Sequence, residues 1–138
     1  MGSYRTHFEF NENLQHKEVI LHFGAVSSAM YVWVNGQKVG YSEDSKTPAE
    51  FDITPFLKKG KNLLAVEVFR WSDASYLEDQ DFWRMSGITR DVYLLTRNKT
   101  SIRDFWAQAG LTTDYKTGLL KLQVDLQGKE TNGHQILA

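Results

Sequence analysis

The stretch Met30–Tyr41, MYVWVNGQKVGY, indicates the fold most directly. Two runs rich in β-branched and aromatic residues flank the dipeptide Asn35–Gly36. Because both residues of such a turn need a positive φ, Asn-Gly between two such runs is a strong signal for a tight β-hairpin. The stretch therefore predicts two antiparallel strands joined by a two-residue turn.

Strand-like segments continue on both sides of this hairpin at short spacing. Residues 4–10 alternate apolar and polar side chains, which is the period of a half-buried strand. Further runs of β-forming residues lie at 18–23, 63–71, 91–95, 102–109 and 119–126. Helical periodicity is nearly absent, apart from a single turn expected at 54–57 with Thr54 as cap and Pro55 at the first helical position. Many short strands of this kind predict an all-β sandwich, with Trp33, Phe69 and Trp71 expected in its core.

Composition and charge exclude several classes of site. Sixteen Lys and Arg stand against 17 Asp and Glu, a net charge of −1, so no basic excess is available for a phosphate backbone or an anionic lipid surface. We therefore expect no nucleic-acid and no membrane partner. The absence of cysteine excludes disulfides, thiolate metal sites and cysteine nucleophiles. The four histidines include no pair at metal-ligand spacing.

A polar interval at Arg97–Thr100 follows an apolar strand and suggests a domain boundary. About forty residues follow, enough for two or three strands. Because so few strands bury little apolar surface by themselves, we expect the chain to belong to a longer protein.

Residues 70–90 concentrate acidic and aromatic side chains in a segment expected to be a loop. The acids are Asp73, Glu78, Asp79 and Asp81, the aromatic residues are Trp71, Tyr76, Phe82 and Trp83, and Arg70, Arg84 and Arg90 flank them. Neighbouring carboxylates repel one another, so an arginine, a backbone donor or a cation must offset that repulsion. The residues alone leave two interpretations open. One is a sugar- or cation-binding loop with stacking aromatic rings, which the density of Trp and Tyr favours; the other is a solvated acidic loop held by packing.

The motifs of this segment and of the hairpin follow one another in a characteristic order. They are Asn35–Gly36, Val39–Tyr41, Asp44–Ser45, Pro48, Glu50–Asp52, Trp71–Asp73, Ser75–Asp81, Trp83–Ile88 and Arg90–Val92. In this order the chain closely resembles the large β-galactosidases of glycoside hydrolase family 2, a resemblance that weakens after about Asp114. It implies that residues 1–97 form a galactose-binding-like jelly-roll domain lacking its first strands. It also implies that residues 98–138 form the N-terminal part of an immunoglobulin-like sandwich.

The resemblance further implies roles for individual residues. Asp81 matches an aspartate that reaches into the active site of the family's catalytic barrel and binds the galactosyl C6 hydroxyl and a sodium ion; an acceptor-only carboxylate suits both. Asp73 matches a ligand of a peripheral magnesium site. At that site Glu43 stands where the best-known members carry glutamine, and the N-terminal segment that supplies other ligands has no counterpart here. The remaining residues expected to support the loop are Glu78, Asp79, Trp83 and Arg84.

In this family both catalytic glutamates lie in the barrel, beyond Ala138. The resemblance therefore implies a non-catalytic N-terminal portion of a retaining β-galactosidase, inactive alone, with sodium and magnesium as cofactors of the parent enzyme. Its expected partners are the galactoside, the remaining domains of the parent chain and further copies of the parent enzyme. Two alternatives stay open, a free-standing carbohydrate-binding module and a purely structural docking domain. The sequence leaves the compartment open between cytoplasm and periplasm.

Overall fold

The computed structural model describes residues 1–11, 16–78, 81 and 83–128. The chain divides into two compact units, Met1–Thr96 and Arg97–Ala138. Both consist mainly of strands, and helical structure in the described residues is confined to two short segments, so the fold class is all-β as predicted. No helix in this described part is long and apolar enough to cross a membrane.

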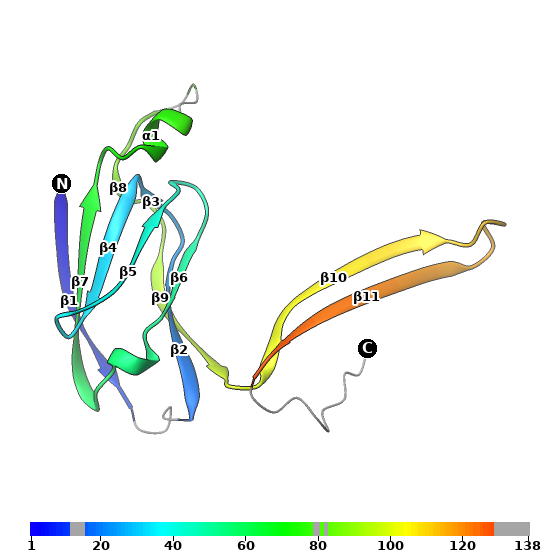
Figure 1. The fold of residues 1–138 in the computed structure, drawn as a ribbon, viewed down its shortest axis with the longest axis horizontal. Helices are drawn as coiled ribbons and strands as arrows, with labels where there is room; N and C mark the ends of the chain where they lie inside the picture. The colour runs from blue at the N-terminus through cyan, green and yellow to red at the C-terminus, as the bar shows by residue number, and fades with distance from the viewer. Residues whose placement is uncertain (12–15, 79–80, 82, 129–138) are drawn as a thin grey trace. The chain divides into compact units, whose positions relative to one another are not determined.

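The first unit contains two main sheets that face each other, and a small third one (Figure 1). One main sheet has the strand order β1 (Gly2–Phe10), β7 (Gly60–Phe69), β4 (Ala29–Val34) and β5 (Gln37–Glu43). The other has the order β6 (Ala49–Asp52), β2 (Lys17–Phe23) and β9 (Val92–Asn98). The small sheet pairs β3 (Val26–Ser27) with β8 (Gly87–Ile88). These elements agree with the predicted sandwich of short strands.

The predicted hairpin is confirmed at β4 and β5. Val34 lies opposite Gln37 in the antiparallel register, and the two intervening residues have positive φ values of 52° for Asn35 and 81° for Gly36. These are the backbone angles that a type I′ turn requires, and they explain why Asn and Gly occupy these positions. The register shifts once, between Val32 and Trp33, where a β-bulge lies.

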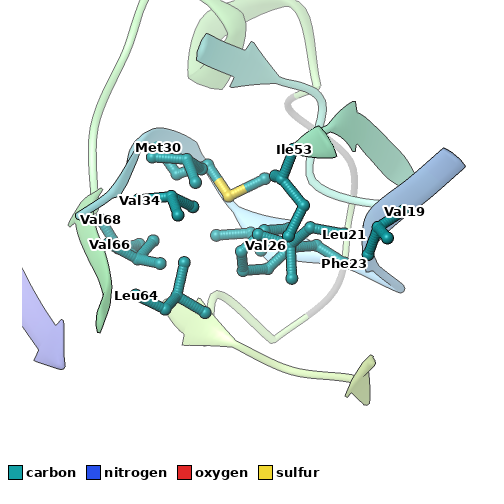
Figure 2. Close-up of a cluster of buried hydrophobic side chains, with 11 residues drawn as sticks. Val19, Leu21, Phe23, Val26, Met30, Val34, Ile53, Leu64, Val66 and Val68 are labelled. Atoms are coloured by element: carbon teal, nitrogen blue, oxygen red, sulfur yellow. The ribbon is translucent and has the colours of Figure 1, made fainter. Parts of the chain in front are cut away.

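The core lies between the two main sheets (Figure 2). Its buried side chains are Val19, Leu21, Phe23, Val26, Met30, Val32, Val34, Ile53, Leu64, Val66 and Val68. From Met30 along β4 and from Asn62 along β7 every second side chain is buried, as expected when one face of a sheet packs on a core.

The prediction that three aromatic residues lie in this core is wrong. Trp33 and Phe69 are only half-buried because they occupy the alternate positions of β4 and β7, on the outer face of the sheet. Trp71 lies beyond the end of β7 and is 58% exposed. The aliphatic neighbours of these aromatic residues, not the rings, form the core. On the outer face the Tyr31 ring contacts the rings of Trp33 and Phe69, with centroids 5.9 and 6.0 Å apart.

The single turn expected at 54–57 is the 3₁₀ helix η2, Thr54–Phe56. Its N-cap position is Ile53 and Thr54 makes no side-chain cap, so the predicted capping role is wrong and the helix begins one residue earlier than expected. The Thr54 hydroxyl instead accepts a hydrogen bond from the backbone N–H of Val19, at 2.8 Å, and ties η2 to β2.

The second unit contains a long antiparallel hairpin of β10 (Ser101–Leu111) and β11 (Gly118–Gln127). Large apolar side chains on both strands, among them Phe105 and Leu120, are more than half exposed. The assignment of residues 98–138 to an immunoglobulin-like domain, and of residues 1–97 to a jelly roll without its first strands, stays a prediction.

Candidate functional site

The acidic and aromatic segment, here called the acidic loop and defined as residues 70–86, connects the end of β7 to β8 (Figure 1). It emerges at the end of the sandwich where Phe69 pairs with Ala29, opposite to the end that carries the Asn35–Gly36 turn. The loop contains one turn of α-helix, α1 (Ala74–Leu77), that hydropathy patterning did not predict. The Glu78 N–H donates to the Ala74 carbonyl at 2.9 Å and closes this turn.

Glu78 joins the acidic loop to a distant part of the chain. Its two carboxylate oxygens, Oε1 and Oε2, accept hydrogen bonds from the backbone N–H of Ser45 at 3.1 and 3.2 Å. Ser45 lies in the turn after β5 and is 7% exposed, while Glu78 itself is half-buried. A backbone donor therefore satisfies one of the clustered acids, which is one of the three compensations expected from the sequence.

Serine hydroxyls attach the beginning of the acidic loop. Ser72 Oγ lies 3.0 Å from Ser28 Oγ, and the Ser28 N–H donates to the Phe69 carbonyl at 2.9 Å. Ser75 Oγ accepts the Ser72 N–H at 3.0 Å. Ser28 is 4% exposed, so the first residues of the loop are held by a hydrogen bond to a buried hydroxyl.

A small pocket lies between the acidic loop and the ends of the strands. Its lining includes Ser27, Ser28, Ser45, Arg70, Trp71, Ser75, Glu78, Arg84, Met85 and Ser86. Its volume is about 60 Å³, far below the roughly 300–1,000 Å³ of typical small-molecule sites. The pocket has hydroxyl, guanidinium and carboxylate groups suited to sugar hydroxyls, but it is too small to enclose a sugar ring.

Several described residues of the loop are open to solvent. Asp81 is exposed, and within the described residues no hydrogen bond or ion pair engages its carboxylate. Tyr76 and Trp83 are 86% and 87% exposed, and Arg84 is exposed beside the pocket. Asp79 and Phe82 lie outside the described residues. A carboxylate and aromatic rings that face solvent are available to a partner or a ligand.

The two residues expected near a magnesium ion, Glu43 and Asp73, act on the same phenol. The Tyr41 hydroxyl donates a hydrogen bond to Glu43 Oε1. Partial burial, this hydrogen bond and the negative charges of Glu43 and Asp73 raise the pKa of Tyr41 above its ordinary value. In the part of the chain that the structure describes, no three His, Cys, Asp or Glu side chains cluster as metal ligands. Mg²⁺ usually keeps several waters beside one or two carboxylates, so a site at Asp73 and Glu43 stays a prediction.

Sequence reasoning missed three members of this site, Ser28, Ser45 and Ser72. Ser45 belongs to one of the motifs that carry the family resemblance, but its role as the amide donor to Glu78 has no local signal. The two residues are 33 positions apart, and only the closure of the sandwich brings them together.

The family model described as "Glycosyl hydrolases family 2, sugar binding domain" matches residues 1–98. The chain belongs to this family. The matched residues of this family 2 member include the strands of the first unit, the acidic loop and β9.

Curated relatives of this chain carry the name β-galactosidase. The β-galactosidase of Priestia megaterium is 52% identical over 126 residues, which is 91% of this chain and 12% of that protein. The β-galactosidase of Clostridium acetobutylicum is 49% identical over 93% of this chain and 14% of that protein. The β-galactosidase large subunit of Latilactobacillus sakei is 47% identical over 97% of this chain and 21% of that protein. The chain thus spans about an eighth to a fifth of the length of these relatives.

Solved structures with a similar fold have lower sequence identity to this chain. A β-glucuronidase from an uncultured Clostridium has a TM-score of 0.80 and 24% identity, and covers 93% of this chain and 24% of its own. A β-glucuronidase from Bacteroides uniformis has a TM-score of 0.71 and 26% identity, and covers 78% of this chain and 14% of its own. Because its sequence identity is below 25%, the first of these structures supports only the fold of this chain and not a function.

Proposed function

We propose that this chain is the non-catalytic N-terminal portion of a retaining β-galactosidase that hydrolyses terminal β-D-galactosyl residues. The observation that carries the proposal is the match to several β-galactosidases at 44–52% identity over nine-tenths or more of the chain. The glucuronidases with a similar fold are far less similar in sequence, at 22–26% identity. Sequence similarity thus favours a galactoside over a glucuronide as the substrate of the parent enzyme.

Within that enzyme, the acidic loop supplies a substrate-binding carboxylate, that of Asp81. An ionised carboxylate only accepts hydrogen bonds, so it can hold a sugar hydroxyl and at the same time act as one oxygen ligand of a sodium ion. Two observations support this role: Asp81 is an exposed residue of the loop, and no group of the described residues engages its carboxylate. A single carboxylate does not complete a cation site, so other parts of the enzyme must supply the remaining ligands.

The chemistry of hydrolysis lies elsewhere in the parent chain. Retention needs two carboxyl groups about 5–5.5 Å apart on either side of the glycosidic bond. The described acids of the loop are not paired with one another: Glu78 is bonded to the Ser45 amide, and Asp73 and Asp81 are exposed. The small pocket beside them does not enclose a sugar ring. This chain therefore contributes one wall of a site whose catalytic glutamates lie beyond Ala138.

The test is Asp81→Asn in the full-length enzyme. This variant keeps the shape of the side chain and removes its charge. Losing a charged hydrogen bond typically costs ~1.5–3 kcal/mol, so kcat/KM for a chromogenic galactoside should fall about ten- to a hundredfold, and the sodium dependence should change. Glu9→Gln, on an exposed strand position at the other end of the sandwich, is the control and should behave like the wild type. Wild-type kinetics with an unaltered sodium dependence in Asp81→Asn would remove Asp81 from the site and favour a docking domain.

A second candidate, a free-standing carbohydrate-binding module, has one observation in its favour. A depression of about 420 Å³ lies on the β1–β7–β4–β5 sheet and is lined by Trp33, Arg5, Glu67 and neighbouring residues. An aromatic ring beside charged hydrogen-bonding groups is a common platform for a sugar. Titration calorimetry of the isolated chain with galactose separates the two candidates, since saturable binding at millimolar or lower concentration that Trp33→Ala abolishes would favour the module.

A further inference from the structure

Glu78 links two segments that are distant in the sequence and that only the tertiary structure brings together. One is the acidic loop, which carries Asp81 three residues after Glu78, and the other is the turn after β5 that contains Ser45. Both oxygens of the Glu78 carboxylate approach the Ser45 N–H, at 3.1 and 3.2 Å. A hydrogen bond to an ionised acceptor is about twice as strong as a neutral one, and the partial burial of both residues limits competition from water.

The turn that receives Glu78 is held by its own hydrogen bonds. The Asp44 carboxylate oxygen Oδ1 accepts the N–H groups of Lys46 and Thr47 at 3.0 and 3.2 Å. Asp44 itself has a φ of 114°, a conformation that the surrounding contacts must maintain. The Ser45 N–H therefore belongs to a turn with a fixed conformation, so it can hold the Glu78 carboxylate in a defined position.

The acidic loop is held at two places on either side of α1. Before the helical turn, Ser72 meets Ser28 through their hydroxyls at 3.0 Å; after it, Glu78 meets Ser45. Three residues of extended chain span at most about 10 Å, so the position of Asp81 depends on where Glu78 is held. The Glu78–Ser45 bond is the last described side-chain hydrogen bond between the loop and the rest of the sandwich before Asp81. Without it, the nearest such bond preceding Asp81 would be the one between Ser72 and Ser28.

We propose that Glu78 is a positioning residue, whose bond to the Ser45 amide holds the loop so that the Asp81 carboxylate reaches the C6 hydroxyl of the galactosyl group. This inference rests on the proposed function of Asp81. Glu78 touches neither substrate nor catalytic groups; it acts only through Asp81. Its removal should therefore weaken the one contact that Asp81 makes and leave the rest of substrate recognition intact.

The experiment compares Glu78→Ala, Glu78→Gln and Asp81→Asn in the full-length enzyme, with Glu9→Gln as the control. Each is assayed on a chromogenic β-D-galactoside and on its 6-deoxy counterpart, which lacks the C6 hydroxyl. Glu78→Ala should lower kcat/KM on the galactoside about ten- to a hundredfold, because small misplacements of a substrate contact have effects of this size. On the 6-deoxy substrate the loss should largely disappear. Glu78→Gln keeps one acceptor oxygen for Ser45 and should lose less than Glu78→Ala.

Two further measurements distinguish positioning from a general structural role. In the double variant Glu78→Ala with Asp81→Asn, kcat/KM on the galactoside should be no lower than in Asp81→Asn alone, because both changes remove the same contact. Amide hydrogen exchange of the full-length Glu78→Ala enzyme should rise in peptides covering residues 43–48 and 74–86 and remain unchanged over β4 and β7.

The outcomes separate this inference from the function on which it rests. If Asp81→Asn is impaired on the galactoside while Glu78→Ala behaves as wild type, the positioning role is wrong and the role of Asp81 stands. An equal loss on both substrates, or losses that add in the double variant, would likewise overturn positioning. If Asp81→Asn is silent on both substrates, the proposed function itself fails. Should Glu78→Ala not accumulate as folded enzyme, Glu78→Gln decides the question with the same two substrates.

Discussion

The side chain of Asn35 donates a hydrogen bond from its amide nitrogen to Oδ1 of Asn62, at 2.8 Å. Asn62 is 0% exposed, and its own amide nitrogen donates to the carbonyls of Lys58 and Gly60, both at 2.8 Å. Asn35 in turn donates to the Phe56 carbonyl and accepts the Leu63 N–H. These two asparagines thus connect the β4–β5 turn, η2 and the start of β7.

Replacing Asn62 by alanine should destabilise the first unit strongly. The change removes the side-chain partner of the Lys58 N–H, of the Lys58 and Gly60 carbonyls and of one Asn35 amide N–H, each at a cost of about 1–3 kcal/mol if it remains buried. We expect a loss of roughly 2–5 kcal/mol in the free energy of unfolding. Urea denaturation of the 138-residue chain measures it, and Asn11→Ala at an exposed position is the matched control. Similar stabilities of both variants would show that the asparagine network does little for the fold.

Gly40→Ala should be destabilising for a steric reason. A Cβ at this position would lie 2.6 Å from Cε1 of the Phe51 ring, and this ring packs edge-on against Phe23 in the core at a centroid distance of 6.1 Å. Forcing the ring aside should cost about 1–3 kcal/mol. Gly110→Ala is the control, since nothing lies within 4 Å of its added Cβ. A smaller residue at position 51 should restore part of the stability lost in Gly40→Ala, and equal effects of the two glycine substitutions would contradict the steric explanation.

Val32→Thr tests which face of β4 forms the core. Val32 is 0% exposed, and threonine has nearly the same shape but places a hydroxyl where only apolar side chains surround it. Burying that hydroxyl without a partner should cost about 1–3 kcal/mol. The same substitution at Val92, which is 36% exposed, should change the free energy of unfolding by much less. Thermal unfolding of the two variants side by side measures the difference, and the reverse ranking would mean that the core has been misidentified.

The turn after β5 should respond to acid through Asp44. Hydrogen bonds from the Thr47 side chain and from the N–H groups of Lys46 and Thr47 lower the pKa of this carboxyl below its ordinary value. Since the folded pKa is the lower one, ionised Asp44 contributes stability above its unfolded pKa of about 3.9, and this contribution disappears as pH falls through the folded pKa. Asp44→Asn keeps an acceptor oxygen but cannot titrate.

The pH series compares urea midpoints of the wild type and Asp44→Asn from pH 7 down to pH 2. The wild type should be the more stable protein at neutral pH, by a small margin because the group is exposed. The margin should shrink below about pH 4 and vanish at the acid end. A difference that does not change with pH would place the effect of the substitution elsewhere, for example in the positive φ of Asp44, which asparagine tolerates better.

The isolated 138-residue chain should not hydrolyse a chromogenic β-galactoside. It offers one open wall with a pocket of about 60 Å³, and of its described loop acids Glu78 is bonded to the Ser45 amide while Asp73 and Asp81 are exposed. The assay uses purified chain, with the double variant Glu78→Ala and Asp81→Ala to detect contaminating enzyme. Turnover that disappears in the double variant would promote these two residues to a catalytic pair.

Local chemistry in the sequence was enough for the fold class and most strands. The Asn35–Gly36 turn requires positive φ at both residues, and the residues on either side of it favour β-strands, so together they predict a hairpin. The family could also be recognised from the motifs of the acidic loop, because their residue types and spacing survive without any knowledge of contacts. These properties depend on neighbours a few positions away, which the sequence displays directly.

Only the tertiary structure decided which faces are buried and which distant groups meet. The pairing of β4 with β7 places Val32 opposite Val66 on the inner face of the sheet and leaves Trp33 and Phe69 on its outer face, although the aromatic side chains are the larger hydrophobic groups. The partner of Glu78 is likewise a backbone N–H, at Ser45, and a main-chain donor has no residue type by which a sequence could reveal it. Burial and long-range hydrogen bonds are properties of the packed sheets, and they come into existence when the two layers close on each other.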